Sequence, residues 1–199
     1  MLTLVLGGAR SGKSQYAQAL VGERPAIYLA TARRTHDREM SGRLERHRAD
    51  RPSSWTTIEE PEAVPRVVRA AAPAGAPVLV ECATLWLSNL FERETHTPAR
   101  RQQEILMSAV RELADACRLR EVIVVSNEVG GGIVPATRVG RRFRDLQGWA
   151  NQILAAEAES VVLVVAGLPL VLKAQNDPHG RNSTTPSRSR SRSARTRAG

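Results

Sequence analysis

Eight residues near the start of the chain have the types and the spacing of a loop that binds phosphate groups. They fit the pattern G-x-x-x-x-G-K-[ST], and here they are Gly7, Gly8, Ala9, Arg10, Ser11, Gly12, Lys13 and Ser14. Glycines let backbone N–H groups surround a polyphosphate, the lysine reaches the outer phosphates, and the hydroxyl faces Mg²⁺ at a helix N-terminus. We therefore expect a nucleoside triphosphate site with Mg²⁺. A turn that only joins a strand to a helix would leave Lys13 and Ser14 without a packing role.

Glu81 is the second residue whose position suggests chemistry, because it ends an apolar run. Three roles are open from the residues alone: holding Mg²⁺ through water, acting as base toward a substrate hydroxyl, or capping the helix expected after Ala83. An acid after an apolar strand is the magnesium-side partner expected in phosphate-loop proteins, which favours the first two roles. Ser14 and Glu81 are thus the expected metal-binding residues.

His47 lies between two arginines, with Asp50 and Arg51 close behind. A neutral imidazole can attack phosphorus, and neighbouring guanidinium groups can stabilise the negative charge that develops. From the residues alone, a surface position on a helix is the simpler interpretation of this histidine. Glu59 has a similar ambiguity, since it could be a favourable charge at a helix N-terminus. The guanine-reading stretch Asn-Lys-x-Asp of switch GTPases does not occur.

The elements that must position these residues alternate along the chain. Apolar runs predict strands at 1–6, 26–30, 77–82, 122–125, 161–165 and 170–172. Helical spacing predicts helices at 15–21, 37–49, 85–91, 99–117 and 138–160. Strands that are continuous Val/Ile/Leu runs indicate a mostly parallel sheet covered on both faces, which is a three-layer α/β fold. Ligands of such sheets bind beyond the carboxyl ends of the strands, where the phosphate loop, Thr31, Glu81 and Asn127 should meet.

Length and composition favour one domain followed by a tail. The chain has 199 residues, begins with a core strand, and contains no apolar run long enough to span a membrane, so we expect a soluble cytoplasmic protein. The two cysteines, Cys82 and Cys117, lie far apart and belong to no metal-binding cluster, so both should be small buried hydrophobes. We expect the folded domain to cover residues 1–173.

Residues 174–199 carry much of the positive charge of the chain. Six arginines and one aspartate give this segment a net charge of +5, out of +9 for the whole chain. The segment is rich in Ser and Arg and has no apolar periodicity, which predicts disorder. A solvated appendage is the simpler interpretation, and a basic arm that binds RNA is the alternative.

The ordered set of motifs resembles one family, the bifunctional adenosylcobinamide kinase / adenosylcobinamide-phosphate guanylyltransferase family of cobalamin biosynthesis. Besides the loop at 7–14, the matching segments are 28–32, Glu39, Met40, Arg43, His47, 51–52, Trp55, Glu59, Pro61, 81–82, Thr84, 89–90, 126–130, 133–135, 143–145, 151–152 and 167–173. The resemblance therefore covers residues 1 to 173, and it implies a P-loop nucleoside triphosphate hydrolase-like (RecA-like) fold.

The resemblance implies two reactions. In the first, the γ-phosphate of ATP or GTP is transferred to adenosylcobinamide. In the second, GMP passes from GTP through a guanylylated His47 to adenosylcobinamide phosphate, giving adenosylcobinamide-GDP. The resemblance also implies guanine-nucleotide contacts at Thr31, Ala32, Arg33, Arg48, Ala49, Asp50, Arg51, Glu59 and Glu81. The alternative is a small-molecule P-loop kinase without guanylyl transfer, in which His47 would be idle.

Two segments depart from the family pattern: the tail, and the pair Leu168-Pro169, to which we assign no function. Members of the family are typically oligomeric and commonly trimeric. We expect a homo-oligomer with exposed apolar groups around Trp86 and Phe91. We expect neither a membrane nor a nucleic acid as a partner.

Overall fold

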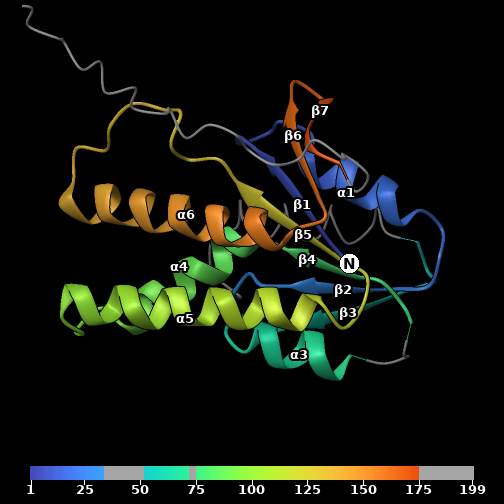
Figure 1. Cartoon of the computed structure of the whole chain (residues 1–199), viewed down its shortest axis with the longest axis horizontal. Helices are drawn as coiled ribbons and strands as arrows, with labels where there is room; N and C mark the ends of the chain where they lie inside the picture. The colour runs from blue at the N-terminus through green and yellow to red at the C-terminus, as the bar shows by residue number, and fades with distance from the viewer. Residues whose placement is uncertain (34–51, 72–74, 175–199) are drawn as a thin grey trace, which may run out of the picture.

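The chain folds around one seven-stranded sheet with the order β3-β2-β4-β5-β1-β6-β7 (Figure 1). The structure is a computed structural model, and it describes residues 1–33, 52–71 and 75–174. The strands are β1 (Leu2–Gly7), β2 (Ala26–Ala30), β3 (Trp55–Glu59), β4 (Val78–Glu81), β5 (Val122–Asn127), β6 (Ser160–Val165) and β7 (Leu168–Lys173). Every neighbouring pair is parallel except β6 and β7, which confirms the mostly parallel sheet.

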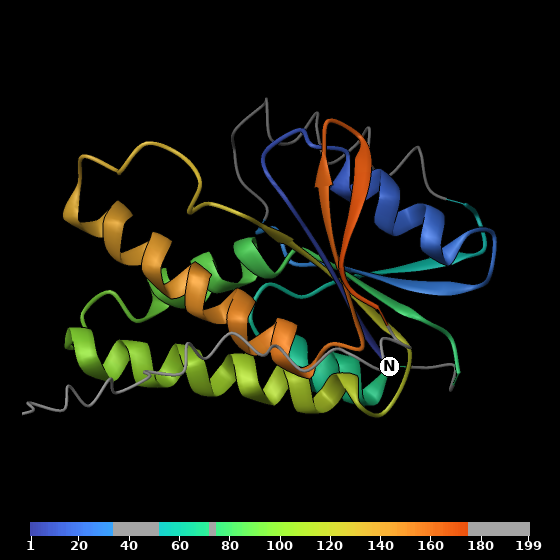
Figure 2. The ribbon, with the colours of Figure 1, turned by 45° about the horizontal axis from the view of Figure 1, so that its top comes forward.

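Helices cover both faces of the sheet, as the uninterrupted apolar strands predict. The described helices are α1 (Lys13–Val21), α3 (Val64–Ala70), α4 (Ala83–Arg93), α5 (Ala99–Cys117) and α6 (Arg138–Glu157). Helix α1 packs on one face, and the other four lie on the opposite side of the sheet (Figures 1 and 2). The three-layer α/β architecture is therefore confirmed.

The side-chain alternation of the strands divides the interior into two cores. On the central strand β1, Leu4 and Leu6 belong to the core under α3 to α6, whereas Val5 belongs to the core under α1. On β5, Val124 and Val125 divide in the same way. Because successive side chains of a strand point to opposite faces, these assignments also fix which way the polar residues at the strand ends point.

The sequence prediction misses two consecutive elements, the edge strand β3 and helix α3. Strand β3 pairs with β2 in parallel, from Ala26 opposite Trp55 to Ala30 opposite Glu59, and the rings of Tyr28 and Trp55 stack with centroids 6.4 Å apart. Helix α3 follows it. The strand also decides one open question: Glu59 ends β3 and is not at a helix N-terminus. The neighbouring Glu60 is the acid at the N-terminus of α3, because its carboxylate accepts hydrogen bonds from two N–H groups just before that helix.

The remaining differences are in the boundaries. Helix α1 begins at Lys13 instead of residue 15, and α6 ends at Glu157 instead of residue 160. Strand β7 spans six residues, and the unassigned pair Leu168-Pro169 is its beginning. The helix predicted at 37–49 lies outside the described residues.

The turn between β6 and β7 packs against the phosphate loop. Ala166 and Gly167 have positive φ angles of 52° and 81°, which form a tight turn. The Gly167 N–H donates a hydrogen bond of 2.8 Å to the carbonyl oxygen of Ser11. Gly12 has a φ of +93°, and a Cβ atom on it would lie 3.1 Å from Gly167 Cα. The loop is thus fixed from the far end of the chain.

The prediction that Trp86 is exposed is wrong. This side chain is only 1% exposed, it belongs to the core under α3 to α6, and its Nε1–H donates to the Glu62 carbonyl. Phe91 is half-buried and meets Phe143 edge to face. The apolar spacing on α4 therefore serves the interior of one subunit. Both cysteines are buried as expected. Among the described helices, none has the length and hydropathy needed to cross a membrane.

Candidate nucleotide site

The loop between β1 and α1 has the form that phosphate binding requires. Gly8, Ala9 and Arg10 are exposed, so their backbone is open to a ligand. Lys13 is buried, and its ammonium group donates a hydrogen bond of 3.1 Å to the Gly8 carbonyl, which folds the side chain back over the loop. A Cβ atom on Gly7 would lie 2.7 Å from the backbone carbonyl oxygen of Val164 and 2.3 Å from Ser11 Oγ, so only glycine fits there. The contacts of Gly7 and Lys13 thus define the shape of the loop.

Ser14 and Glu81 meet directly at the base of this loop. The Ser14 hydroxyl donates a hydrogen bond of 2.7 Å to Glu81 Oε1. Helix α4, which follows Glu81, has Cys82 as its N-cap residue. The contact with Ser14 therefore favours the two roles of Glu81 that involve the phosphate loop.

A hydroxyl beside a carboxylate is a donor set that suits Mg²⁺, which prefers oxygen ligands and keeps several waters. Ser14 and Glu81 would hold such an ion together with the nucleotide phosphates. Within the described residues there is no cluster of three or more acidic, His or Cys side chains that would bind a metal ion unaided. One hydroxyl and one carboxylate leave the other positions around Mg²⁺ to water and phosphate oxygens.

The hydroxyl of Thr31, a predicted nucleotide contact, is bonded within the protein. Thr31 is fully buried, and its Oγ1 donates to the Cys82 carbonyl and accepts from the Cys82 N–H, both at 2.8 Å. Its carbonyl accepts a hydrogen bond from the Asn89 side chain. This residue therefore joins the end of β2 to the end of β4, beside Glu81.

Arg33, also predicted to contact the nucleotide, lies in an ion-pair cluster with Glu62, Glu92 and Arg93. Its guanidinium group is 2.7 Å from Glu62 Oε1 and 3.1 Å from Glu92 Oε2, and Arg93 also pairs with Glu62. The hydrogen bond from Arg33 lowers the pKa of Glu62. Of the other predicted contacts, Ala32 is half-buried next to Arg33, and Glu59 is exposed at the end of β3. His47, Arg48, Ala49, Asp50 and Arg51 lie outside the described residues.

A buried polar network at the end of β5 was not predicted as a unit. The Ser126 hydroxyl donates to Asn151 Oδ1 at 2.7 Å and accepts from Gln147 Nε2 at 2.9 Å. Thr84 Oγ1, at the start of α4, accepts the Asn127 N–H at 2.8 Å. One sequence signal exists for this network: Gln147 and Asn151 are polar residues four positions apart on the face of α6 that otherwise carries core residues.

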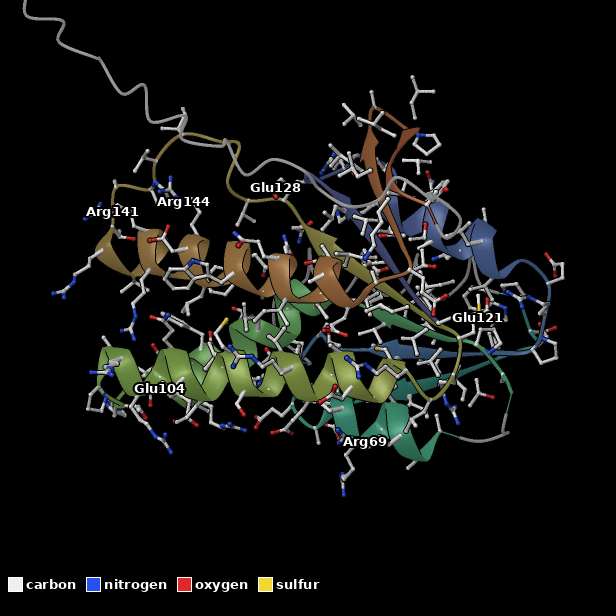
Figure 3. The ribbon with its side chains drawn as sticks, in the orientation of Figure 1. Arg69, Glu104, Glu121, Glu128, Arg141 and Arg144 are labelled. Atoms are coloured by element: carbon white, nitrogen blue, oxygen red, sulfur yellow. The ribbon has the colours of Figure 1, made fainter. Side chains whose placement is uncertain are left out.

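The site lies at one end of the sheet. Glu121 and Glu128 flank β5 and mark its two ends, and Figure 3 shows them well separated. The Glu128 N–H donates to the Gly7 carbonyl at 3.0 Å, so the Glu128 end is the end of the phosphate loop. The expected convergence of the loop, Glu81 and Asn127 at the carboxyl ends of the strands is thus confirmed.

Comparisons with known proteins identify relatives that match most of the chain. Residues 3–172 match the family described as cobinamide kinase / cobinamide phosphate guanyltransferase. The chain is 42% identical over 177 residues to the bifunctional adenosylcobalamin biosynthesis protein CobP of Pseudomonas aeruginosa, covering 88% of this chain and 99% of the relative. It is 38% identical over 182 residues to the bifunctional adenosylcobalamin biosynthesis protein CobU of Escherichia coli, covering 87% of this chain and all of the relative.

A solved structure of a Pyrococcus horikoshii OT3 protein shares the fold. The TM-score is 0.52 at 8% sequence identity, and the match covers 88% of this chain and 87% of that one. This likeness concerns the arrangement of strands and helices only.

Proposed function

Because the chain belongs to the cobinamide kinase / cobinamide phosphate guanyltransferase family, we propose that it performs both reactions on the corrinoid intermediates of adenosylcobalamin biosynthesis. The observation that carries the proposal is the complete phosphate loop with Ser14 bonded to Glu81. A loop of this kind binds a nucleotide whatever reaction follows, and the family supplies the two reactions.

In the kinase step, the hydroxyl of the aminopropanol arm of adenosylcobinamide attacks the γ-phosphorus of ATP or GTP. A P–O bond forms to the corrinoid, the bond to the β-phosphate bridging oxygen breaks, and the nucleoside diphosphate leaves. Lys13 and the loop N–H groups stabilise the negative charge on the phosphates. Mg²⁺ held at Ser14 and Glu81 supplies charge neutralisation when bound. Glu81 also accepts the proton of the attacking hydroxyl.

In the guanylyltransferase step, a nitrogen of His47 attacks the α-phosphorus of GTP and pyrophosphate leaves. The phosphate of adenosylcobinamide phosphate then attacks the same phosphorus, the P–N bond breaks, and adenosylcobinamide-GDP leaves with the histidine regenerated. Splitting one difficult displacement into two through a covalent intermediate is the usual gain of nucleophilic catalysis. The support for His47 is its setting between two arginines and the family match across residues 3–172.

The finer assignments belong to the same proposal. Residues 7–14, 31–33 and 48–51 with Glu59 and Glu81 contact the nucleotide, residues 1–173 form the catalytic domain, and 174–199 form a disordered tail. The enzyme is a homo-oligomer. The support for this comes from the edge strand β7 and not from the buried Trp86: four apolar side chains of β7 are each more than half exposed, namely Leu168, Leu170, Val171 and Leu172. A cytoplasmic location accords with the family's biosynthetic role.

The test uses GTP radiolabelled at the α-phosphorus with Mg²⁺, followed by a denaturing gel, and a parallel assay of phosphate transfer to adenosylcobinamide. Four proteins are compared: the wild type, His47→Ala, Lys13→Ala, and His96→Ala as the matched control. His96 is exposed after α4 and has no place in either reaction.

We expect label on the wild type and on His96→Ala that survives alkali and is lost in acid, as a phosphoramidate is. His47→Ala should carry no label but should still phosphorylate the corrinoid, and Lys13→Ala should lose both activities. A wild type that phosphorylates the corrinoid and binds GTP but takes no label would instead identify a small-molecule kinase without guanylyl transfer.

A further inference from the structure

We propose that the side-chain amide of Asn127 binds the γ-phosphoryl group during the kinase step. This inference rests on the proposed function, and it adds a residue to that site. The residue is the last of β5, the strand that lies between β1 with the phosphate loop and β4 with Glu81. Its position between the two is therefore set by the order of the strands.

The strand register places the Asn127 side chain on the correct face of the sheet. Asn127 lies opposite Gly7, where the phosphate loop begins, and Val125 lies opposite Glu81. Register partners in a parallel sheet point to the same face, and so do residues two apart on one strand. Val125 belongs to the core under α1. Asn127 therefore faces the α1 side, as Glu81 does.

The backbone of Asn127 is fixed on both sides, whereas its side chain is not used by the fold. Its N–H donates to Thr84 Oγ1 at 2.8 Å, and its carbonyl accepts from Asn151 Nδ2 at 3.1 Å. Among the residues that the structure describes, the Asn127 amide group has no hydrogen-bond partner. The side chain is half-buried, so it is shielded in part but open to a ligand.

The buried network of Ser126, Gln147 and Asn151 explains why the backbone of Asn127 is held by the fold, whereas its side chain bonds to none of the described residues. Ser126 points to the opposite face and is fully buried, where Gln147 and Asn151 hold its hydroxyl. Hydrogen bonds in a low-dielectric interior are strong, and these hold the end of β5 in place. Asn127 is thus presented from a fixed strand end, and preorganised donors of that kind are effective in catalysis.

An amide suits the chemistry at this position. During γ-phosphoryl transfer, negative charge is spread over the equatorial oxygens of the transferred group, and an N–H donor aimed at them stabilises it. A carboxylate there would repel both the phosphates and Glu81. In the guanylyltransferase step the reacting atom is the α-phosphorus, so the same donor is far less involved in bond breaking. Loss of the Asn127 amide should therefore reduce the kinase activity much more than the guanylyltransferase activity.

The test compares the wild type with Asn127→Ala, Asn127→Asp and, as matched control, Gln103→Ala, whose amide is exposed on α5. Three quantities are measured on each protein: kcat and KM for phosphate transfer to adenosylcobinamide, the rate of labelling by α-labelled GTP, and the GTP dissociation constant. Asn127→Asp keeps the size of the side chain, which guards against an Ala variant that folds poorly.

We expect the kinase kcat to fall about 100-fold in Asn127→Ala and further in Asn127→Asp, as on removal of one transition-state donor. In Asn127→Ala, labelling and GTP affinity should stay within about threefold of the wild type. In Asn127→Asp, the added charge should also weaken GTP binding, so its kinase kcat is compared at saturating nucleotide. The inference is overturned if both variants keep the wild-type kinase kcat, or if kinase, labelling and GTP binding fall in parallel in Asn127→Ala. A wild type that lacks kinase activity would count against the proposed function itself.

Discussion

The Ser14 hydroxyl and the Glu81 carboxylate are joined by a hydrogen bond of 2.7 Å across 67 residues of sequence. The bond connects the first turn of α1 to the end of β4, two strands away from β1 in the sheet. The catalytic proposals depend on this contact, because it holds a hydroxyl and a carboxylate side by side at the base of the phosphate loop.

Glu81→Gln should remove the negative charge of this residue while keeping its hydrogen bond to Ser14. The amide oxygen still accepts from Ser14, so the melting temperature should change little. Both activities should fall about 10- to 100-fold and need more Mg²⁺, because an orienting carboxylate of a metal site is lost. A Mg²⁺ titration of each activity measures this, with the exposed Glu112→Gln as control. An unchanged Mg²⁺ requirement would refute the metal role.

Gly12→Ala should destabilise the protein, whereas Gly148→Ala should not. Gly12 has a φ of +93° and is in close contact with Gly167, so an added methyl group meets both strain and backbone atoms. We expect a loss of about 1–2 kcal/mol or more in the free energy of unfolding. Gly148 lies in α6 with nothing within 4 Å of an added Cβ, and alanine there should gain about 0.5–1 kcal/mol. Urea unfolding of both variants checks the difference in sign.

Asn151→Leu should cost stability out of proportion to its volume, because it removes three hydrogen bonds from the buried network. The Ser126 hydroxyl and the Gln147 amide each lose an acceptor, and the Asn127 carbonyl loses a donor. We expect a loss of about 1–3 kcal/mol in the free energy of unfolding. The neighbouring exposed Gln152→Leu is the control. Equal stability of the two variants in urea would show that the network contributes nothing net.

The two cysteines should be unreactive in the folded protein. Burial raises the pKa of Cys82 to about 11 and that of Cys117 to about 12. At about pH 8 both thiols therefore stay protonated, and a thiol reagent should modify neither until denaturant is added. Above about pH 9 the unfolded chain releases these protons while the folded chain keeps them, so stability should fall as pH rises. Rapid modification of the native protein would contradict this burial.

Removing residues 174–199 should leave both activities intact. Lys173 is retained, because its ammonium group donates to the carbonyls of Ala155 and Ala156 at the end of α6. We expect the truncated chain to match the full chain in corrinoid phosphorylation and GTP labelling within about twofold, because the family match ends at residue 172. If the tail is a basic arm for RNA, its removal should abolish a strongly salt-dependent RNA affinity that the full chain shows.

The elements predicted correctly from the sequence are those with a clear local sequence pattern. The strands ending at Gly7, Ala30 and Glu81 are short runs of apolar residues, and α5 repeats its apolar residues at helical spacing over 19 residues. The phosphate loop is specified by residue types within eight positions. For these segments local preference and tertiary fold agree, so a sequence pattern is sufficient.

The missed elements depend on distant partners. Strand β3 has only two apolar residues, Trp55 and Ile58, and it is stabilised by pairing with β2 and by the stacking of Trp55 on Tyr28. Helix α3 has seven residues and a proline in its first turn, so it carries almost no periodic signal. The bonds of Thr31 and Arg33 likewise join segments that only the fold brings together. No local pattern encodes such contacts.

The contact between Gly167 and Ser11 also sets an order of events during synthesis. The phosphate loop leaves the ribosome well before the turn between β6 and β7, whose Gly167 N–H group fixes Ser11. The strands β5 and β6, which flank β1 in the sheet, are also synthesised after the loop, so β1 has no neighbouring strands to pair with until they emerge. A nascent chain therefore acquires a competent phosphate loop only after β6 and β7 have emerged, and fragments cut short before β6 should bind no nucleotide.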